Sequence, residues 1–114
     1  MLSERIKILQ DAGLIGEESA GFAEKTGRIL MDRFQNQGDA VSVFVTHLAM
    51  AVQRIMMNEQ VDEVDDIIWQ EVKNSEHCQK ANELLKLVLA QAPCEIPESE
   101  RRFLIIHLCN IYNS

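Results

Sequence analysis

The chain has few of the residues that break helices. Its 114 residues include only two prolines and five glycines, and Gly38, Pro93 and Pro97 are the clearest breaks. The intervals between these residues are long, and no internal repeat or low-complexity tract occurs within them. This scarcity indicates helices joined by short loops.

Cysteine is also scarce, and long apolar runs are absent. The three cysteines, Cys78, Cys94 and Cys109, are odd in number and form no CxxC pair, which argues against a disulfide framework. No apolar run approaches the roughly 20 residues that span a bilayer. Residues 1–14 are interrupted by charges and lack the apolar core of a secretory signal. We therefore expect a cytoplasmic protein that does not associate with a membrane.

Basic residues are outnumbered by acidic ones. Lys and Arg total 11 and Asp and Glu total 18, so the formal net charge is −7. Because gripping a phosphate backbone requires a cationic surface, direct binding to nucleic acid is not expected. The hydrophobic fraction of 46% is that of an ordinary globular domain, and the length allows one such domain.

Apolar residues recur at helical spacing in five segments. The first two cover residues 18–35 and 40–58, with Asp39 as the predicted N-cap of the second. Asp62 or Asp65 is the predicted cap of a third segment, whose apolar face consists of Val64, Ile67, Ile68 and Val72. A fourth segment starts at Ser75 and stops before Pro93, and a fifth starts at Pro97.

Two of these segments also have features of strands. Residues 41–46 alternate and are rich in β-branched side chains, and residues 103–112 are apolar nearly throughout. The helical pattern continues for three turns beyond the first stretch, and proline followed by glutamates before the second favours a helix. We predict an all-α bundle of five helices over residues 17–114. The N-terminal segment 1–16 has room for a short additional helix around residues 4–10.

The three histidines differ in their surroundings. His77 follows Glu76 at a polar helix start and is expected to be solvated, whereas His47 and His107 lie within apolar helices. Each of the latter two is either a core histidine with satisfied hydrogen bonds or a reactive imidazole that serves as nucleophile, ligand or pH switch.

Arg54 follows His47 by seven positions and Glu100 precedes His107 by seven, which is two turns on one helix face in each case. Arg54 is therefore expected to reach toward an anion at His47, and Glu100 to orient His107, unless both are ordinary solvated charges.

Recognised enzyme and metal-site motifs are missing. His77-Cys78 and His107-x-Cys109 are spaced too closely to place two ligands on one helix face, so neither a metal site nor a cofactor is expected. The chain contains no GxSxG, P-loop, GxGxxG or HExxH sequence, and we do not expect it to be an enzyme.

Two stretches around the apolar histidines resemble a known family. Residues 44–54, FVTHLAMAVQR, resemble the first histidine motif of the PTS regulation domain (PRD), in which His-Leu is followed by an arginine seven positions after the histidine. Residues 96–108, IPESERRFLIIHL, resemble its second motif, in which Ile-Pro-x-x-Glu leads through an apolar run to histidine. Ala81 matches an alanine common in the fourth helix of the family, and the likeness covers about residues 18–112.

The resemblance implies a five-helix domain whose histidines accept phosphoryl groups from the bacterial sugar phosphotransferase system. It makes His47 and His107 the candidate phosphorylation sites, with Arg54 and Glu100 as supporting residues. The donor implied is the phosphocarrier HPr or an enzyme II component, and the module implied is a homodimer that controls transcription. One departure is Thr46, because many members have aspartate before the first histidine.

Regulators of this family usually carry two such domains and an output domain. Residues 1–16 are too few for an RNA-binding or DNA-binding module, so we expect a stand-alone PRD-like protein that acts on an unidentified partner protein. The alternative is a helical dimerisation or scaffold domain that keeps the fold without phosphorylation. An enzyme of unknown type is the third reading and lacks a motif.

Overall fold

Six helices make up the described part of the chain, residues 2–59 and 64–112 of a computed structural model, and no strand occurs there. They are α1 (Leu2–Asp11), α2 (Glu17–Arg33), α3 (Gly38–Met56), α4 (Asp66–Lys73), α5 (Cys78–Leu89) and α6 (Glu98–Tyr112). The all-α prediction is confirmed, and the two strand-like stretches lie in α3 and α6. The described residues form six helices against the five of the predicted bundle, because α1 forms in the N-terminal segment, where the sequence left room for a short helix around residues 4–10.

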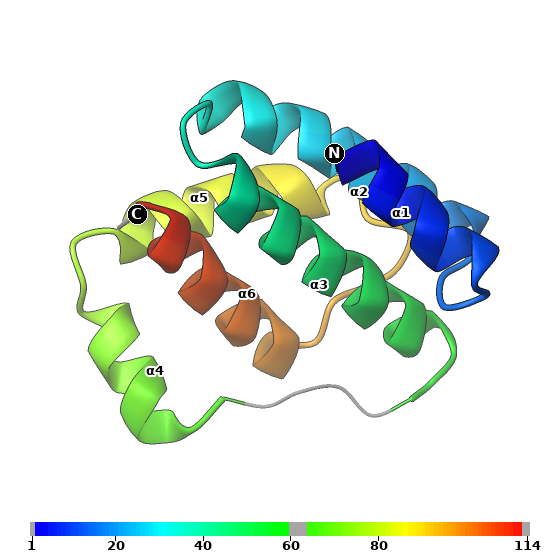
Figure 1. Ribbon diagram of the computed structural model, residues 1–114. Helices are drawn as coiled ribbons and strands as arrows, with labels where there is room; N and C mark the ends of the chain where they lie inside the picture. The colour runs from blue at the N-terminus through cyan, green and yellow to red at the C-terminus, as the bar shows by residue number, and fades with distance from the viewer. Residues whose placement is uncertain (1, 60–63, 113–114) are drawn as a thin grey trace.

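The helices pack in an order that differs from their order in the chain. α2 lies against α3, α3 against α6, and α6 against α5, so that α3 and α6 are neighbours although α4 and α5 separate them in sequence (Figure 1). α1 packs on α2 and α3, and α4 contacts α6 at one side of the molecule (Figure 1). The fold therefore brings the two histidine-bearing helices together.

The predicted apolar stripes of α2, α3, α5 and α6 form the core. Buried side chains include Phe22 and Leu30 from α2, Phe44 and Leu48 from α3, and Leu84 from α5. Leu2, Ile6 and Ile15, from the predicted segment 1–16, belong to the same core. Gly27 lies directly against α1, because a Cβ there would lie 2.5 Å from Leu2 Cδ2 and the leucine side chain would have to move.

The ends of α3 follow from local hydrogen bonding. The helix begins at Gly38 with Gln37 as its N-cap, so the prediction that Asp39 caps it is wrong by two residues. It ends where Asn58 adopts a left-handed conformation with φ of 58°. There the Glu59 amide donates to the Arg54 carbonyl at 2.8 Å and the Asn58 amide to that of Ile55 at 3.1 Å, which is a Schellman motif.

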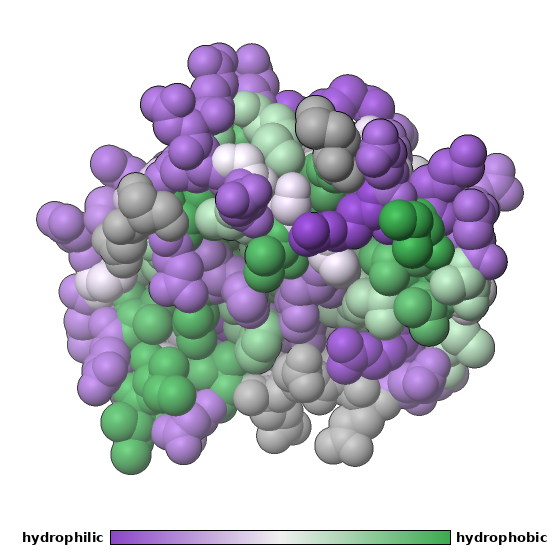
Figure 2. Space-filling view, in the orientation of Figure 1, coloured by the Kyte–Doolittle hydropathy of each residue, from purple (hydrophilic) through white to green (hydrophobic). Residues whose placement is uncertain are grey.

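The apolar face predicted for α4 is largely uncovered. Asp65 caps the helix, because its side chain accepts a hydrogen bond from the Ile67 amide at 2.8 Å, whereas the other predicted cap, Asp62, lies outside the described residues. No residue of α4 is buried, and Ile67 and Ile68 are 72% and 50% exposed. An apolar patch over α4 is visible at the lower left of Figure 2.

One arginine of α6 makes several contacts with α4. The Arg102 guanidinium lies 5.1 Å from the centre of the Trp69 ring, a cation–π contact. It also forms ion pairs with Asp66 of α4 at 3.8 Å and with Glu98 of its own helix at 3.5 Å.

The described helices are too short or too polar to cross a bilayer.

Candidate functional site

His47 lies in the middle of α3 on the side that faces α6. The flanking residues Phe44 and Leu48 are buried, which fixes the helix against its neighbours. The His47 side chain itself keeps 18% of its surface exposed. It is therefore partly accessible from solvent, although its helix is packed.

His107 lies on α6, between the second and third turns after the helix starts at Glu98. Pro97 immediately precedes this start, and its carbonyl accepts a hydrogen bond from the Arg101 amide at 3.0 Å, so the predicted helix start is correct to within one residue. Leu104, Leu108 and Ile111 are buried and hold α6 in the core. The His107 side chain is half-buried.

The two imidazole rings stack on each other. The ring centres of His47 and His107 are 5.0 Å apart and the ring planes differ by 25°. Phe103, one turn before His107, lies 4.6 Å from the His47 ring and 4.7 Å from the His107 ring. Phe44 lies 6.4 Å from His107. The two predicted site histidines thus form one cluster with an aromatic wall.

Glu100 joins the cluster, but its partner is not the histidine expected from spacing. Its Oε1 lies 3.1 Å from Nε2 of His47, on the neighbouring helix, and no hydrogen bond joins it to His107, on its own helix. The carboxylate is 1% exposed, and its Oε2 has no hydrogen-bond partner. A buried carboxyl group with one oxygen lacking a partner is costly, and its contact with His47 is the hydrogen bond that offsets this cost.

Burial is the main influence on the protonation of His107. It lowers the pKa of this imidazole below its usual value of 6.5, because the charged form loses hydration. The nearby His47 lowers the pKa further, whereas Glu100 opposes both by raising it. His107 is consequently neutral at physiological pH and carries a free lone pair on one ring nitrogen.

The remaining predicted supports lie on α3. Arg54 is half-buried in the last turn of the helix, two turns beyond His47. Thr46 stands where many PRDs have aspartate, and its hydroxyl donates to the Ser42 carbonyl of the same helix at 2.8 Å. The carboxylate that meets His47 therefore comes from Glu100 and not from the residue before the histidine.

His77 is less solvated than predicted. Its ring stacks on Tyr112 with centres 5.7 Å apart, its side chain is 22% exposed, and its Nδ1 is buried without a hydrogen-bond partner. His77 is the residue before α5 and is distant in sequence from both His47 and His107. In the described ranges no three His, Cys, Asp or Glu residues gather as a metal would require.

Phe103 is the cluster member that the sequence reading left unassigned. Its spacing of four from His107 places the two side chains on one helix face, which is a usable signal. Phe44, three positions before His47, has its ring contact with His107 across the interface instead. The pairing of Glu100 with His47 had no such signal, because the two residues are 53 positions apart.

Comparison with family models finds a match described as "PRD domain" over residues 22–111, which is most of the chain and includes both histidine helices. Neither the search of curated proteins nor that of solved structures finds a match.

Proposed function

The chain belongs to the PRD domain family, and we propose that it is a regulatory module of the sugar phosphotransferase system that accepts a phosphoryl group on His107 or His47. Its role is regulatory and not enzymatic. It acts in the cytoplasm through protein contacts to control transcription, without touching nucleic acid itself.

The stacked pair of imidazoles supports this proposal most directly. A neutral imidazole nitrogen attacks the phosphorus of a donor phosphohistidine, the new N–P bond forms, and the N–P bond of the donor breaks. The lowered pKa keeps His107 in the neutral form that this step requires. On His47, Nε2 faces Glu100 at 3.1 Å, so an incoming phosphoryl group there meets a carboxylate. We therefore infer that His107 is the first acceptor.

The short distance between the rings limits the pair to one phosphoryl group at a time. Each group adds about −1.5 to −2 charges near neutral pH. Two groups on rings with centres 5.0 Å apart would repel each other beside the buried Glu100. Arg54, as a cation on the same face of α3, is the expected partner of the group that does form.

We propose the partners from the family resemblance. The donor is HPr or an enzyme II component, and the regulated partner is another protein. The module works as a homodimer, in which a charge added to a two-fold interface counts twice and so shifts the pairing of the chains.

The direct experiment is phosphorylation in vitro. The chain is incubated with phosphoenolpyruvate, enzyme I and HPr, and acid-labile phosphate is measured together with the intact mass. The wild type should gain at most one phosphoryl group per chain. The label should be strongly reduced in His107→Gln and abolished in the variant that replaces both His47 and His107.

His77→Gln is the matched control, because it removes the third histidine of the chain and should leave the label unchanged. Absence of label on the wild type, under conditions that label a two-domain member of the family, would overturn the proposal. Addition of two groups per chain would overturn the inference of one at a time.

The scaffold alternative draws on the same contacts. The His47–Glu100 pair and the packing of Phe103 hold α3 to α6 regardless of phosphate. If the wild type stays unlabelled while His47→Ala unfolds at lower denaturant or loses its dimer, the cluster is structural.

A further inference from the structure

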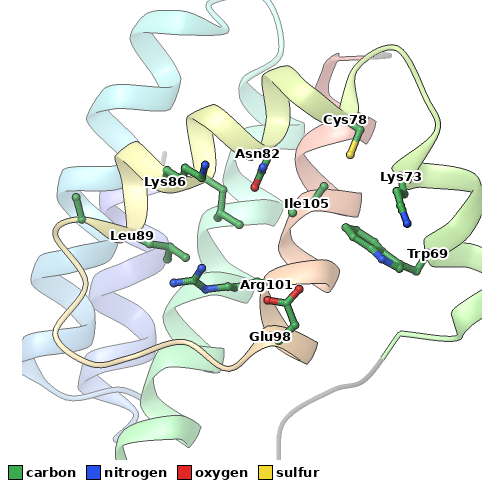
Figure 3. Close-up of a pocket in the computed structure, with 11 residues that line it drawn as sticks. Trp69, Lys73, Cys78, Asn82, Lys86, Leu89, Glu98, Arg101 and Ile105 are labelled. Atoms are coloured by element: carbon green, nitrogen blue, oxygen red, sulfur yellow. The ribbon is translucent and has the colours of Figure 1, made fainter.

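A cavity of about 570 Å³ lies between α4, α5 and α6, on a different side of α6 from the histidine pair. Figure 3 shows its walls, with Trp69 extending from α4 toward α6 and Lys86 and Leu89 coming from α5. Small-molecule sites in proteins commonly fall in the range of roughly 300–1,000 Å³. The cavity is therefore large enough for a compact organic ligand.

The inner part of the cavity is apolar. Leu85 of α5 and Ile105 of α6 are buried side chains that line it, and the Trp69 ring supplies a flat wall. An aromatic or aliphatic group placed there would lose apolar surface to the protein, which is favourable. These side chains suit a ligand with an apolar body.

Each of the three helices also places a cation in the lining. Lys73 comes from α4, Lys86 from α5 and Arg101 from α6. Lys73 and Lys86 form no ion pair within the described ranges, and the Arg101 Nε donates to the Ile96 carbonyl at 3.2 Å. Glu98 is the carboxylate of the lining, and it is paired with Arg102 at 3.5 Å.

This arrangement is unusual for a chain with a net charge of −7. Three cations line one cavity, with Lys86 and Arg101 at the end beside Leu89 and Lys73 at the other end beside Trp69 (Figure 3). The one carboxylate in the lining has a partner of its own. Such a cluster produces a local positive potential that attracts an anion.

We propose that the cavity between α4, α5 and α6 binds a small organic anion, one with a carboxylate or phosphate group attached to an aromatic or aliphatic body. The anionic group lies beside Lys86 and Arg101, and the body lies against Leu85, Ile105 and Trp69. The proposal is independent of phosphorylation, because none of these residues contacts His47 or His107 in the stacked pair.

The chain carries its own reporter for this site. Trp69 is its only tryptophan, so intrinsic tryptophan fluorescence comes from a residue of the cavity wall. The full chain is titrated with 4-phenylbutyrate, with the neutral 4-phenylbutan-1-ol, and with inorganic phosphate. We expect a saturable change with the acid, at least about tenfold weaker binding of the alcohol, and no saturation with phosphate alone.

A pair of lysine variants on one helix tests the contribution of charge. Lys86→Met removes a cation from the lining, and Lys80→Met removes one from α5 outside it. Lys86→Met should weaken binding of 4-phenylbutyrate by about 3- to 10-fold, whereas Lys80→Met should change it less than about twofold. Far-UV circular dichroism verifies that both variants fold.

Three results would overturn the proposal: no saturable response to the acid, equal binding of acid and alcohol, or equal affinity of the two lysine variants. Binding of inorganic phosphate as tightly as the acid would overturn the role of the apolar body. Because none of these readouts uses a phosphoryl donor, they are distinct from failure of the proposed function.

Discussion

Replacement of Ile6 by alanine measures how firmly α1 is joined to the rest of the molecule. Ile6 is 2% exposed in the core, whereas Ile8, on the same helix and of the same residue type, is 67% exposed. Truncation of a buried isoleucine costs about 2–5 kcal/mol, since it combines the lost transfer free energy with a cavity. Alanine is the better helix former by roughly 0.3–0.5 kcal/mol, and this gain is the same at both positions.

The free energy of unfolding should therefore fall by about 2–4 kcal/mol in Ile6→Ala and change by less than about 0.5 kcal/mol in Ile8→Ala. The measurement is urea unfolding followed by far-UV circular dichroism, with the m-value expected to stay constant. Equal stability of the two variants would refute the reasoning, because it would mean that α1 detaches before the core unfolds. The outcome also decides whether residues 1–16 are energetically separate from residues 17–114.

The other predictions concern His107 and α4. Burial and His47 lower the pKa of His107 in the folded chain. As the pH falls below about 6.5, His107 therefore becomes protonated in the unfolded chain before it does in the folded chain, and protonation favours unfolding. The free energy of unfolding should accordingly decrease with falling pH, and a smaller decrease is expected in His107→Gln, measured by urea unfolding across that pH range; an identical pH profile would contradict it. Asp65→Ala removes the cap hydrogen bond to the Ile67 amide, so α4 should lose about 1 kcal/mol of local stability. Hydrogen exchange should then be faster at the α4 amides while the core amides keep their rates, and unchanged α4 exchange would count against the cap.

Local patterns in the sequence were sufficient for the helices that have buried stripes. Phe44 and Leu48 recur at helical spacing, and both are buried in α3. The same reasoning failed for α4, where Ile67 and Ile68 share a face that no other helix covers. Periodicity identifies an apolar face, but what covers that face is decided by elements distant in the sequence.

The candidate site was likewise predicted only in part from local sequence patterns. Two motifs predicted His47 and His107 as site residues, and the contact between α3 and α6 brings their rings together. The assignment of Glu100 to His107 rested on spacing within one helix, whereas its contact is with His47 across the interface. His77 was expected in solvent because its sequence neighbours are polar, but Tyr112 at the far end of α6 covers its ring.

Helix α6 carries residues of both proposed sites on different sides. Phe103 and His107 lie toward α3, and Arg101 and Ile105 line the cavity beside α5. If α6 rotates or slides to accommodate a phosphoryl group, Arg101 and Ile105 move with it and the wall of the cavity changes position. Linkage then requires reciprocity: whatever factor a bound anion imposes on the phosphorylation equilibrium, phosphorylation imposes on the affinity for the anion.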